Sequence, residues 1–166
     1  MALLLATACG CRPGWFAPPP QRPPAAGPEP GTFASFVTMD DALADDYVVR
    51  DVAAERGAFR WAYLHPELRF RVQDSRDLKF AAELAIPEVT FKDTGPVAVS
   101  VLIEGHPLAT LRCPRAGKYR IEKPVPPNWV TPGKTVHVAF ETEPRWVSPL
   151  DGAQLSFLLY NAGFIP

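Results

Sequence analysis

The sequence predicts an all-β domain: an antiparallel β-sandwich of jelly-roll type with about eight or nine strands, following a disordered N-terminal segment. From Phe33 onward the dominant spacing of apolar residues is two, which is typical of strands with one buried face. Turn signals rich in glycine and proline separate these runs, as expected for an antiparallel sandwich. After Phe33 only Met39 to Asp45 carries a helical pattern.

Residues 1–11 are predicted to be an export signal with a lipid attachment site. An apolar run, Ala2 to Ala8, leads directly to Cys9, and small residues precede the cleavage site of a secretory signal. The pattern Leu5-Ala6-Thr7-Ala8-Cys9 resembles a bacterial lipobox, which implies that Cys9 becomes the acylated N-terminus. The run is far shorter than the roughly 20 apolar residues of a transmembrane helix. A chance hydrophobic leader on a cytoplasmic protein is the alternative.

Residues 12–32 are predicted to be a proline-rich linker, and residues 33–166 the sandwich domain. Eight prolines lie between Arg12 and Pro30. Such a tract favours extended polyproline II structure and acts as a semi-rigid spacer. It would hold the domain away from a membrane, so we expect a lipid-anchored protein of the cell envelope, periplasmic or surface-facing. A docking peptide for a proline-recognising partner is the alternative.

Five runs of alternating residues are predicted to be strands whose apolar sides face the core. They lie at Leu68–Val72, Phe80–Ile86, Val97–Ile103, Val136–Phe140 and Leu155–Leu159. Weaker strand signals lie at Tyr47–Asp51, Phe59–Leu64, Leu108–Cys113 and Lys118–Glu122.

Two local features follow from the same pattern. Glu104 to Pro107 is predicted to be a hairpin loop, because a glycine and a proline separate two alternating runs. Trp61 alternates with Phe59 and Tyr63, so we expect its indole in the core.

Composition excludes several classes of function. Lys and Arg number 17 against 18 Asp and Glu, so no basic surface for nucleic acid is predicted. The chain has no phosphate-binding glycine loop, no nucleophile elbow and no Cys-x-x-Cys metal motif. We therefore expect no cofactor, no metal, no catalytic residue and no enzyme. Two carboxylates that are distant in the sequence but adjacent in the folded protein are a catalytic arrangement that these missing motifs do not exclude.

The residues of reactive type are isolated from one another. Cys113 is the one cysteine of the predicted domain and is expected to be a small buried hydrophobe. His65, His106 and His137 are widely separated, so we expect surface or loop-packing roles for them.

Four aspartates form an acidic cluster: Asp40, Asp41, Asp45 and Asp46. Calcium takes six to eight oxygen ligands, but the cluster lacks the glycine and ligand spacing of a calcium loop. We therefore expect a solvated loop or a short helix whose N-terminus is capped by Asp40 or Asp41. A structural calcium ion, as some jelly-roll binding modules carry, is the alternative.

The C-terminal part resembles the end of a galactose-binding-like jelly roll. The residues that carry the resemblance are Gly117-Lys118-Tyr119-Arg120, Val125-Pro126, Trp146-Val147-Ser148-Pro149, Asp151-Gly152, Leu155-Ser156-Phe157 and Gly163-Phe164. Phe59-Arg60-Trp61 fits the first strand of such domains, and the resemblance covers roughly Tyr47 to Ile165. It implies an accessory β-sandwich like those that accompany bacterial glycosyltransferases and cell-surface proteins.

Asn128, Trp129, Trp146 and Asp151 are the predicted ligand-binding residues. A sugar site needs a flat aromatic face beside groups that pair with hydroxyls, and loop tips commonly carry such sites. We therefore predict a noncatalytic, lipid-anchored envelope protein with weak glycan binding. The alternative is a structural or protein-interaction module without sugar binding. The expected partners are a glycan or an envelope protein, and the membrane through the anchor.

Overall fold

The computed structural model describes residues 34–166. The predicted signal, the lipid attachment site at Cys9 and the proline-rich linker lie outside the described residues. Within the described part, no helix combines the length and apolar character needed to cross a membrane.

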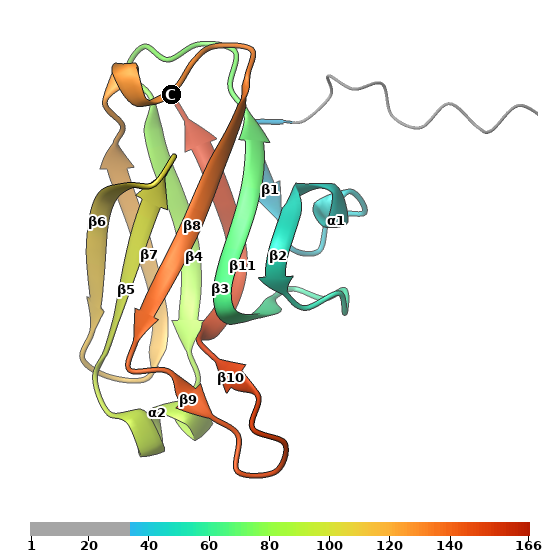
Figure 1. Cartoon of the computed structure of the whole chain (residues 1–166), viewed down its shortest axis with the longest axis vertical. Helices are drawn as coiled ribbons and strands as arrows, with labels where there is room; N and C mark the ends of the chain where they lie inside the picture. The colour runs from blue at the N-terminus through green and yellow to red at the C-terminus, as the bar shows by residue number, and fades with distance from the viewer. Residues whose placement is uncertain (1–33) are drawn as a thin grey trace, which may run out of the picture.

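The described chain forms the antiparallel β-sandwich that the sequence predicts (Figure 1). Its elements in chain order are β1 (Phe36–Thr38), α1 (Ala44–Tyr47), β2 (Val48–Val52), β3 (Arg60–Arg71), β4 (Lys79–Ile86), α2 (Glu88–Thr94), β5 (Val97–Ile103), β6 (His106–Cys113), β7 (Gly117–Pro124), the 3-10 helix η1 (Pro127–Trp129), β8 (Thr135–Glu143), β9 (Trp146–Val147), β10 (Gln154–Leu155) and β11 (Phe157–Ile165).

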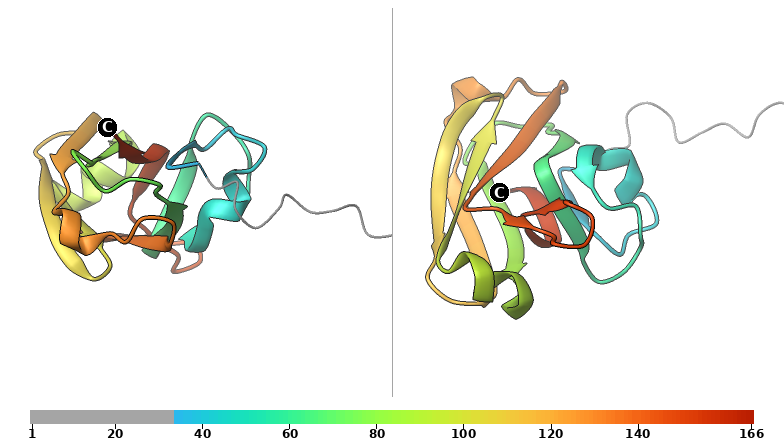
Figure 2. Two further views of the ribbon diagram at one scale, coloured as in Figure 1. Left: turned by 90° about the horizontal axis from the view of Figure 1, so that it is seen from above. Right: turned by 60° about the horizontal axis from the view of Figure 1, so that its bottom comes forward.

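Nine strands form one continuous sheet that folds over into two layers. The hydrogen-bonded order is β6-β5-β8-β3-β11-β4-β7, with β1 added to β11 and β2 added to β3. The layer of β5, β8 and β3 lies in front of the layer of β4, β7 and β11 (Figures 1 and 2). β9 and β10 pair as a small separate sheet, which lies with α2 at the lower end of the sandwich in Figure 1.

The core lies between the two layers and is rich in phenylalanine. Phe164 contacts both Phe70 and Phe80 with ring centroids 5.7 Å apart, and Phe140 contacts Phe157 at 5.5 Å. All five rings are at most 1% exposed. Burying one such side chain stabilises the fold by about 1.5–3 kcal/mol relative to leaving it in water, so this cluster holds the layers together.

A hairpin turn between β5 and β6 is confirmed, but it is shorter than predicted, because His106 and Pro107 already belong to β6. Glu104 and Gly105 have φ angles of 49° and 77°, and Ile103 pairs with His106 across the turn. Two positive φ angles are what a two-residue hairpin turn requires to match the twist of its strands.

Two predicted strands are joined in the structure into the single strand β3. Pro66 lies inside it, although proline cannot donate a ladder hydrogen bond. The pairing with β11 extends from Arg60 to Ala62 and the pairing with β8 begins at Glu67. Pro66 therefore lies in the gap between these two partners, and in the pairing with β2 it lies where the register shifts, between Glu67 and Ala62.

The helix α2 was not expected from the sequence. It begins after Pro87 and ends at Gly95, whose φ of 69° is typical of the residue that stops a helix. Within it Thr90 is the buried residue, so the segment shows no apolar stripe that a pattern search could find.

The expectation that Trp61 packs in the core is wrong. Arg60 and Ala62 face inward and are 1% and 0% exposed, while Trp61 is half-buried on the outer side, opposite Leu158 of β11. Aromatic residues do alternate at the start of β3. The buried position between Phe59 and Trp61, however, is occupied by Arg60.

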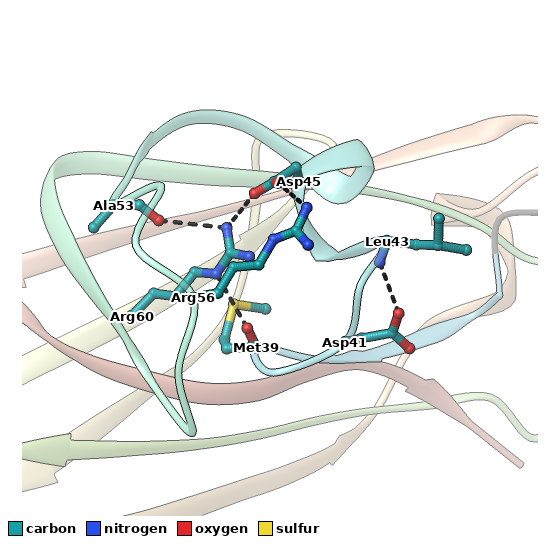
Figure 3. Close-up of polar contacts among 7 residues, drawn as sticks. All are labelled: Met39, Asp41, Leu43, Asp45, Ala53, Arg56 and Arg60. Carbon is teal, nitrogen blue, oxygen red and sulfur yellow. Dashed lines mark hydrogen bonds and ion pairs between the residues drawn. The ribbon is translucent and has the colours of Figure 1, made fainter. Parts of the chain in front are cut away.

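Arg60 faces inward because Met39 and Asp45, in the segment from β1 to α1, supply hydrogen-bond acceptors for its guanidinium (Figure 3). Its Nε donates to the Met39 carbonyl at 3.1 Å, and its Nη1 pairs with the Asp45 carboxylate. Arg56 donates to the other oxygen of Asp45 at 3.1 Å. A buried charge is tolerated only when it is paired and hydrogen-bonded, so this cluster fastens β1 and α1 to β3.

Candidate functional site

Two of the predicted ligand-binding residues, Asn128 and Trp129, lie on η1 at the upper end of the sandwich in Figure 1. Asn128 is exposed. The indole of Trp129 stacks on the His106 ring, with centroids 5.0 Å apart and planes at 21°, and packs against the core. The protein itself therefore uses one face of this ring, and ligand binding here stays a prediction.

The other two, Trp146 and Asp151, lie at the opposite end. Trp146 Nε1 donates to the carboxylate of Asp93 on α2 at 2.6 Å, beside a pocket of about 320 Å³ that both residues line. Asp151 accepts the Ala153 amide at 3.1 Å in the loop between β9 and β10. Hydrogen bonds from Ser148 and this amide lower the pKa of the Asp151 carboxyl, so Asp151 stabilises its own turn.

The structure does not bring the four predicted residues together. η1 and β9 lie at opposite ends of the sandwich (Figure 1). The residue types suited to a sugar are present at both ends, but no single ligand of ordinary size could contact both tryptophans. Asn128 with Trp129 and Trp146 with Asp151 are therefore two separate candidate sites, and ligand binding at each stays a prediction.

A different group of side chains gathers on the outer side of the layer formed by β11, β4 and β7. Tyr160 of β11 packs against Phe59, with ring centroids 5.5 Å apart and planes at 53°. The Nζ atom of Lys118 on β7 lies 3.9 Å from the centre of the Tyr160 ring, within the range of a cation–π interaction. Phe59 is 41% exposed, so the two rings form a partly exposed aromatic platform.

A polar hollow of about 170 Å³ lies on the same three strands. Each strand contributes one polar side chain to its lining: Asn161 from β11, Glu83 from β4 and Arg120 from β7. Glu83 pairs with Asn161 on one side and with Arg120 on the other in the strand register. Side chains at paired positions on one face lie about 5 Å apart, so the three form a row across the sheet.

Small residues form the floor of this hollow. Ala81 lies on the outer side of β4, is 4% exposed, and lines the hollow together with Phe36 and Ile165. An alanine on the outer face of a strand leaves room between longer neighbours, so the surface is depressed here.

The platform and the hollow are one continuous surface. Lys118 contacts the Tyr160 ring and also pairs with Glu83, with Nζ 3.4 Å from Oε1. We name this the β11–β7 surface and define it by six residues. They are Phe59, Glu83, Lys118, Arg120, Tyr160 and Asn161.

The chemistry of the β11–β7 surface suits a ligand rich in hydroxyl groups. The Glu83 carboxylate accepts hydrogen bonds, the Arg120 guanidinium donates them, and the Asn161 amide does both. The partly exposed ring of Phe59 offers an apolar face beside these groups, and Tyr160, with Lys118 over its ring, supports it. A pyranose has the matching properties, because one side of its ring carries C–H groups while hydroxyls project from its rim.

The sequence pattern does not reveal this surface, because its residues come from distant parts of the chain. Phe59 precedes β3, and Tyr160 lies on the last strand. One signal was present in the sequence: Ala81 and Ala85 occupy two outward positions of β4, where longer polar residues are usual.

A second charged arrangement lies on the outer side of the other layer. The Nδ1 atom of His137 is 2.8 Å from Glu67 Oε1, and the second oxygen of Glu67 pairs with Arg50 at 2.8 Å. A histidine oriented by a carboxylate is the usual form of a general base. No serine, threonine or cysteine among residues 34–166 is hydrogen-bonded to this ring.

Cys113 is buried as predicted, but the capping prediction for Asp40 or Asp41 is wrong, because Leu43 is the N-cap of α1 and no side chain caps this helix. Asp41 accepts the Leu43 amide at 2.8 Å just before the short helix α1. Among residues 34–166, no group of three or more histidines, cysteines or acids is placed to hold a metal ion. Cys113 is 1% exposed, and burial raises the pKa of its thiol to about 11. It is therefore a buried apolar side chain rather than a nucleophile.

Comparison with known proteins gives no family. No family model matches the chain, and no curated protein matches it. Among solved structures, the chain is similar to an acetyl xylan esterase from the rumen bacterium Butyrivibrio proteoclasticus, with 12% identity over 78% of this chain and 31% of that chain, at a TM-score of 0.45. It is also similar to an exo-beta-1,3-galactanase from Phanerochaete chrysosporium, with 9% identity over 79% of this chain and 29% of that chain, at a TM-score of 0.43.

These two structures correct one expectation. Both are enzymes, which contradicts the expectation that the chain is not an enzyme, and we withdraw it. The expectation rested on missing sequence motifs, whereas catalytic carboxylates on separate strands meet only in the fold. The chain spans less than a third of the length of either enzyme, so no residue role, substrate or reaction passes to it from them.

Proposed function

We propose that this domain binds carbohydrate on the β11–β7 surface. One observation supports the proposal most directly: Tyr160, which packs against Phe59 from the loop before β3, and the polar hollow lie on the same three strands and are joined by Lys118. Stacking on an aromatic face and hydrogen bonding to hydroxyls are the two contacts that sugar recognition needs. Here both are available within one continuous surface.

The shape of the surface sets the expected affinity. Its polar hollow of about 170 Å³ is smaller than the 300–1,000 Å³ typical of pockets that enclose a whole ligand. A sugar bound here keeps much of its surface in water, so its affinity depends on a few ring contacts and hydrogen bonds. We therefore expect weak binding, with a dissociation constant of about 10 µM to 1 mM.

We also propose that the domain is held at a membrane of the cell envelope. The lipobox pattern ending at Cys9 supports anchoring to a membrane of the cell envelope, with residues 12–32 as the spacer. A weakly binding domain held at a membrane meets polysaccharides of the same envelope at high local concentration, which compensates for low affinity.

Affinity electrophoresis of the full chain tests this function. Soluble polysaccharides are cast in a native gel, and retardation is measured for the wild type, Tyr160→Ala and the matched control Trp129→Ala. We expect retardation by at least one polysaccharide, its loss in Tyr160→Ala, and its retention in Trp129→Ala. Circular dichroism confirms that each variant is folded. Equal retardation of folded Tyr160→Ala and wild type would contradict the proposal.

A further inference from the structure

We propose that the β11–β7 surface selects uncharged polysaccharides and binds them along the chain rather than at an end. This inference rests on the proposed function and adds the class of ligand to it. Two observations support it. The charged side chains of β4 and β7 are paired with one another, and both edges of the surface are exposed to solvent.

Every charged side chain on the outer side of β4 and β7 around the hollow is already paired with another. Lys118 pairs with Glu83 at 3.4 Å, Lys79 pairs with Glu122 at 3.4 Å, and Arg120 pairs with Glu122 at 3.0 Å. An arginine binds a carboxylate most strongly through a bidentate contact with two parallel N–H···O bonds. Here an acidic sugar would have to displace an existing partner.

The position of Glu83 adds a second reason to exclude acidic ligands. It lines the hollow between Asn161 and Arg120, so a ligand carboxylate bound there would lie next to a carboxylate of the protein. Like charges in contact repel each other. Hydroxyl groups have the opposite preference, because a carboxylate is a strong acceptor for them.

The width of the β11–β7 surface indicates how long a bound carbohydrate is. The platform lies on β11 and the outermost polar group of the surface lies on β7, two strand spacings away, which is about 10 Å. A single sugar ring does not cover that distance. Both edges are open, because Phe59 is 41% exposed and the Arg120 side chain is 67% exposed. A chain can therefore continue past the surface on either side.

Isothermal titration calorimetry on the full chain tests both parts. The neutral probes are laminarin, xylan, mannan and cello-oligosaccharides, and the acidic probes are polygalacturonate and hyaluronan. For the best neutral polysaccharide, the matching oligosaccharides are titrated from monosaccharide to hexasaccharide. We expect at least about tenfold tighter binding of the hexasaccharide than of the monosaccharide. We also expect little change in affinity at about 0.5 M NaCl, because an uncharged ligand is not screened.

A pair of variants isolates the role of charge pairing. Glu122→Gln removes the partner of both Lys79 and Arg120, so we expect it to gain binding to polygalacturonate. Glu141→Gln removes an exposed acid on β8, in the other layer, and should gain none. Unchanged binding of polygalacturonate by Glu122→Gln would overturn the charge argument.

The possible results distinguish selection of uncharged chains from carbohydrate binding itself. Tighter, salt-sensitive binding of the acidic probes by the wild type would overturn the selection of uncharged chains and leave carbohydrate binding in place. Equal affinity for monosaccharide and hexasaccharide would overturn binding along the chain. No binding of any probe would overturn the proposed function, and this inference with it.

Discussion

Lys118 of β7 lies with its Nζ atom 3.9 Å from the centre of the Tyr160 ring on β11, across the intervening strand β4. The same nitrogen is 3.4 Å from Glu83 Oε1 on β4. One side chain thus connects three strands and fixes the orientation of the ring against which Phe59 packs. We infer that it prepares the aromatic platform for a ligand before the ligand arrives.

Replacing Lys118 with methionine should weaken carbohydrate binding without unfolding the protein. Methionine keeps the length of the aliphatic stem but removes the charge over the ring. A cation–π contact at an exposed site contributes about 0.5–1 kcal/mol, so we expect the dissociation constant to rise about two- to fivefold. Calorimetry measures this change, and Lys92→Met on α2 serves as the control. Wild-type affinity in Lys118→Met would show that the lysine does not prepare the ring.

Asp45 should make the stability of the protein fall in acid. Hydrogen bonds from Arg60 and then Arg56 lower the pKa of Asp45 below its ordinary value of 3.8. A carboxyl whose pKa is lowered by folding stabilises the fold above the unfolded-state pKa, and this contribution is lost as the pH falls through the folded-state pKa.

The comparison of wild type with Asp45→Asn tests this dependence. Between pH 5 and pH 3 the midpoint of urea unfolding should fall more steeply for the wild type than for the variant. Asp40→Asn, an exposed aspartate of the same cluster, should follow the wild type. Parallel pH profiles for wild type and Asp45→Asn would contradict the role of this ion pair.

Gly163 should not tolerate a side chain. Its φ of 151° is rare for other residues, and a β-carbon at this position would collide with the backbone of Ser35 and Phe36 on and beside β1. We expect Gly163→Ala to destabilise the fold by about 1–3 kcal/mol and to lower the melting temperature correspondingly. Gly57→Ala is the control, because the nearest atom to a β-carbon there is 3.6 Å away. Equal melting temperatures for the two variants would contradict the packing of β1 on β11.

Cys9→Ser should release the protein from the membrane fraction of its host, because the lipobox prediction makes Cys9 the acylated residue. Cys11→Ser, two residues further on, should leave the distribution unchanged. Fractionation followed by immunoblotting measures both. Membrane association of Cys9→Ser equal to that of the wild type would rule out the lipobox.

The sequence predicted the architecture well because a sandwich strand alternates inward and outward residues. Val97–Ile103 is a predicted strand and also the exact extent of β5. The pattern failed where a polar residue occupies an inward position. Arg60 is buried because Met39 and Asp45 accept its hydrogen bonds, and such acceptors cannot be assigned from spacing in the sequence.

The candidate site was harder to predict than the fold. Trp129 and Trp146 were predicted from the sequence to bind a ligand because they are aromatic residues near loops. In the structure the Trp129 ring stacks on His106, and Trp146 donates a hydrogen bond to Asp93. The residues of the β11–β7 surface look like ordinary outward positions of separate strands. Only the order β11-β4-β7 places them side by side, and that order depends on contacts between distant parts of the chain.

Mapping the bound carbohydrate by nuclear magnetic resonance tests the central claim most directly. The ¹⁵N-labelled full chain is titrated with the hexasaccharide of the neutral polysaccharide that retards it most, and backbone amide shifts are followed by residue. We predict the largest shifts at Glu83, Lys118, Arg120, Tyr160 and Asn161, with small shifts on η1 and on the loop between β9 and β10. Shifts concentrated at either end of the sandwich, or none at saturating sugar, would contradict binding on the β11–β7 surface.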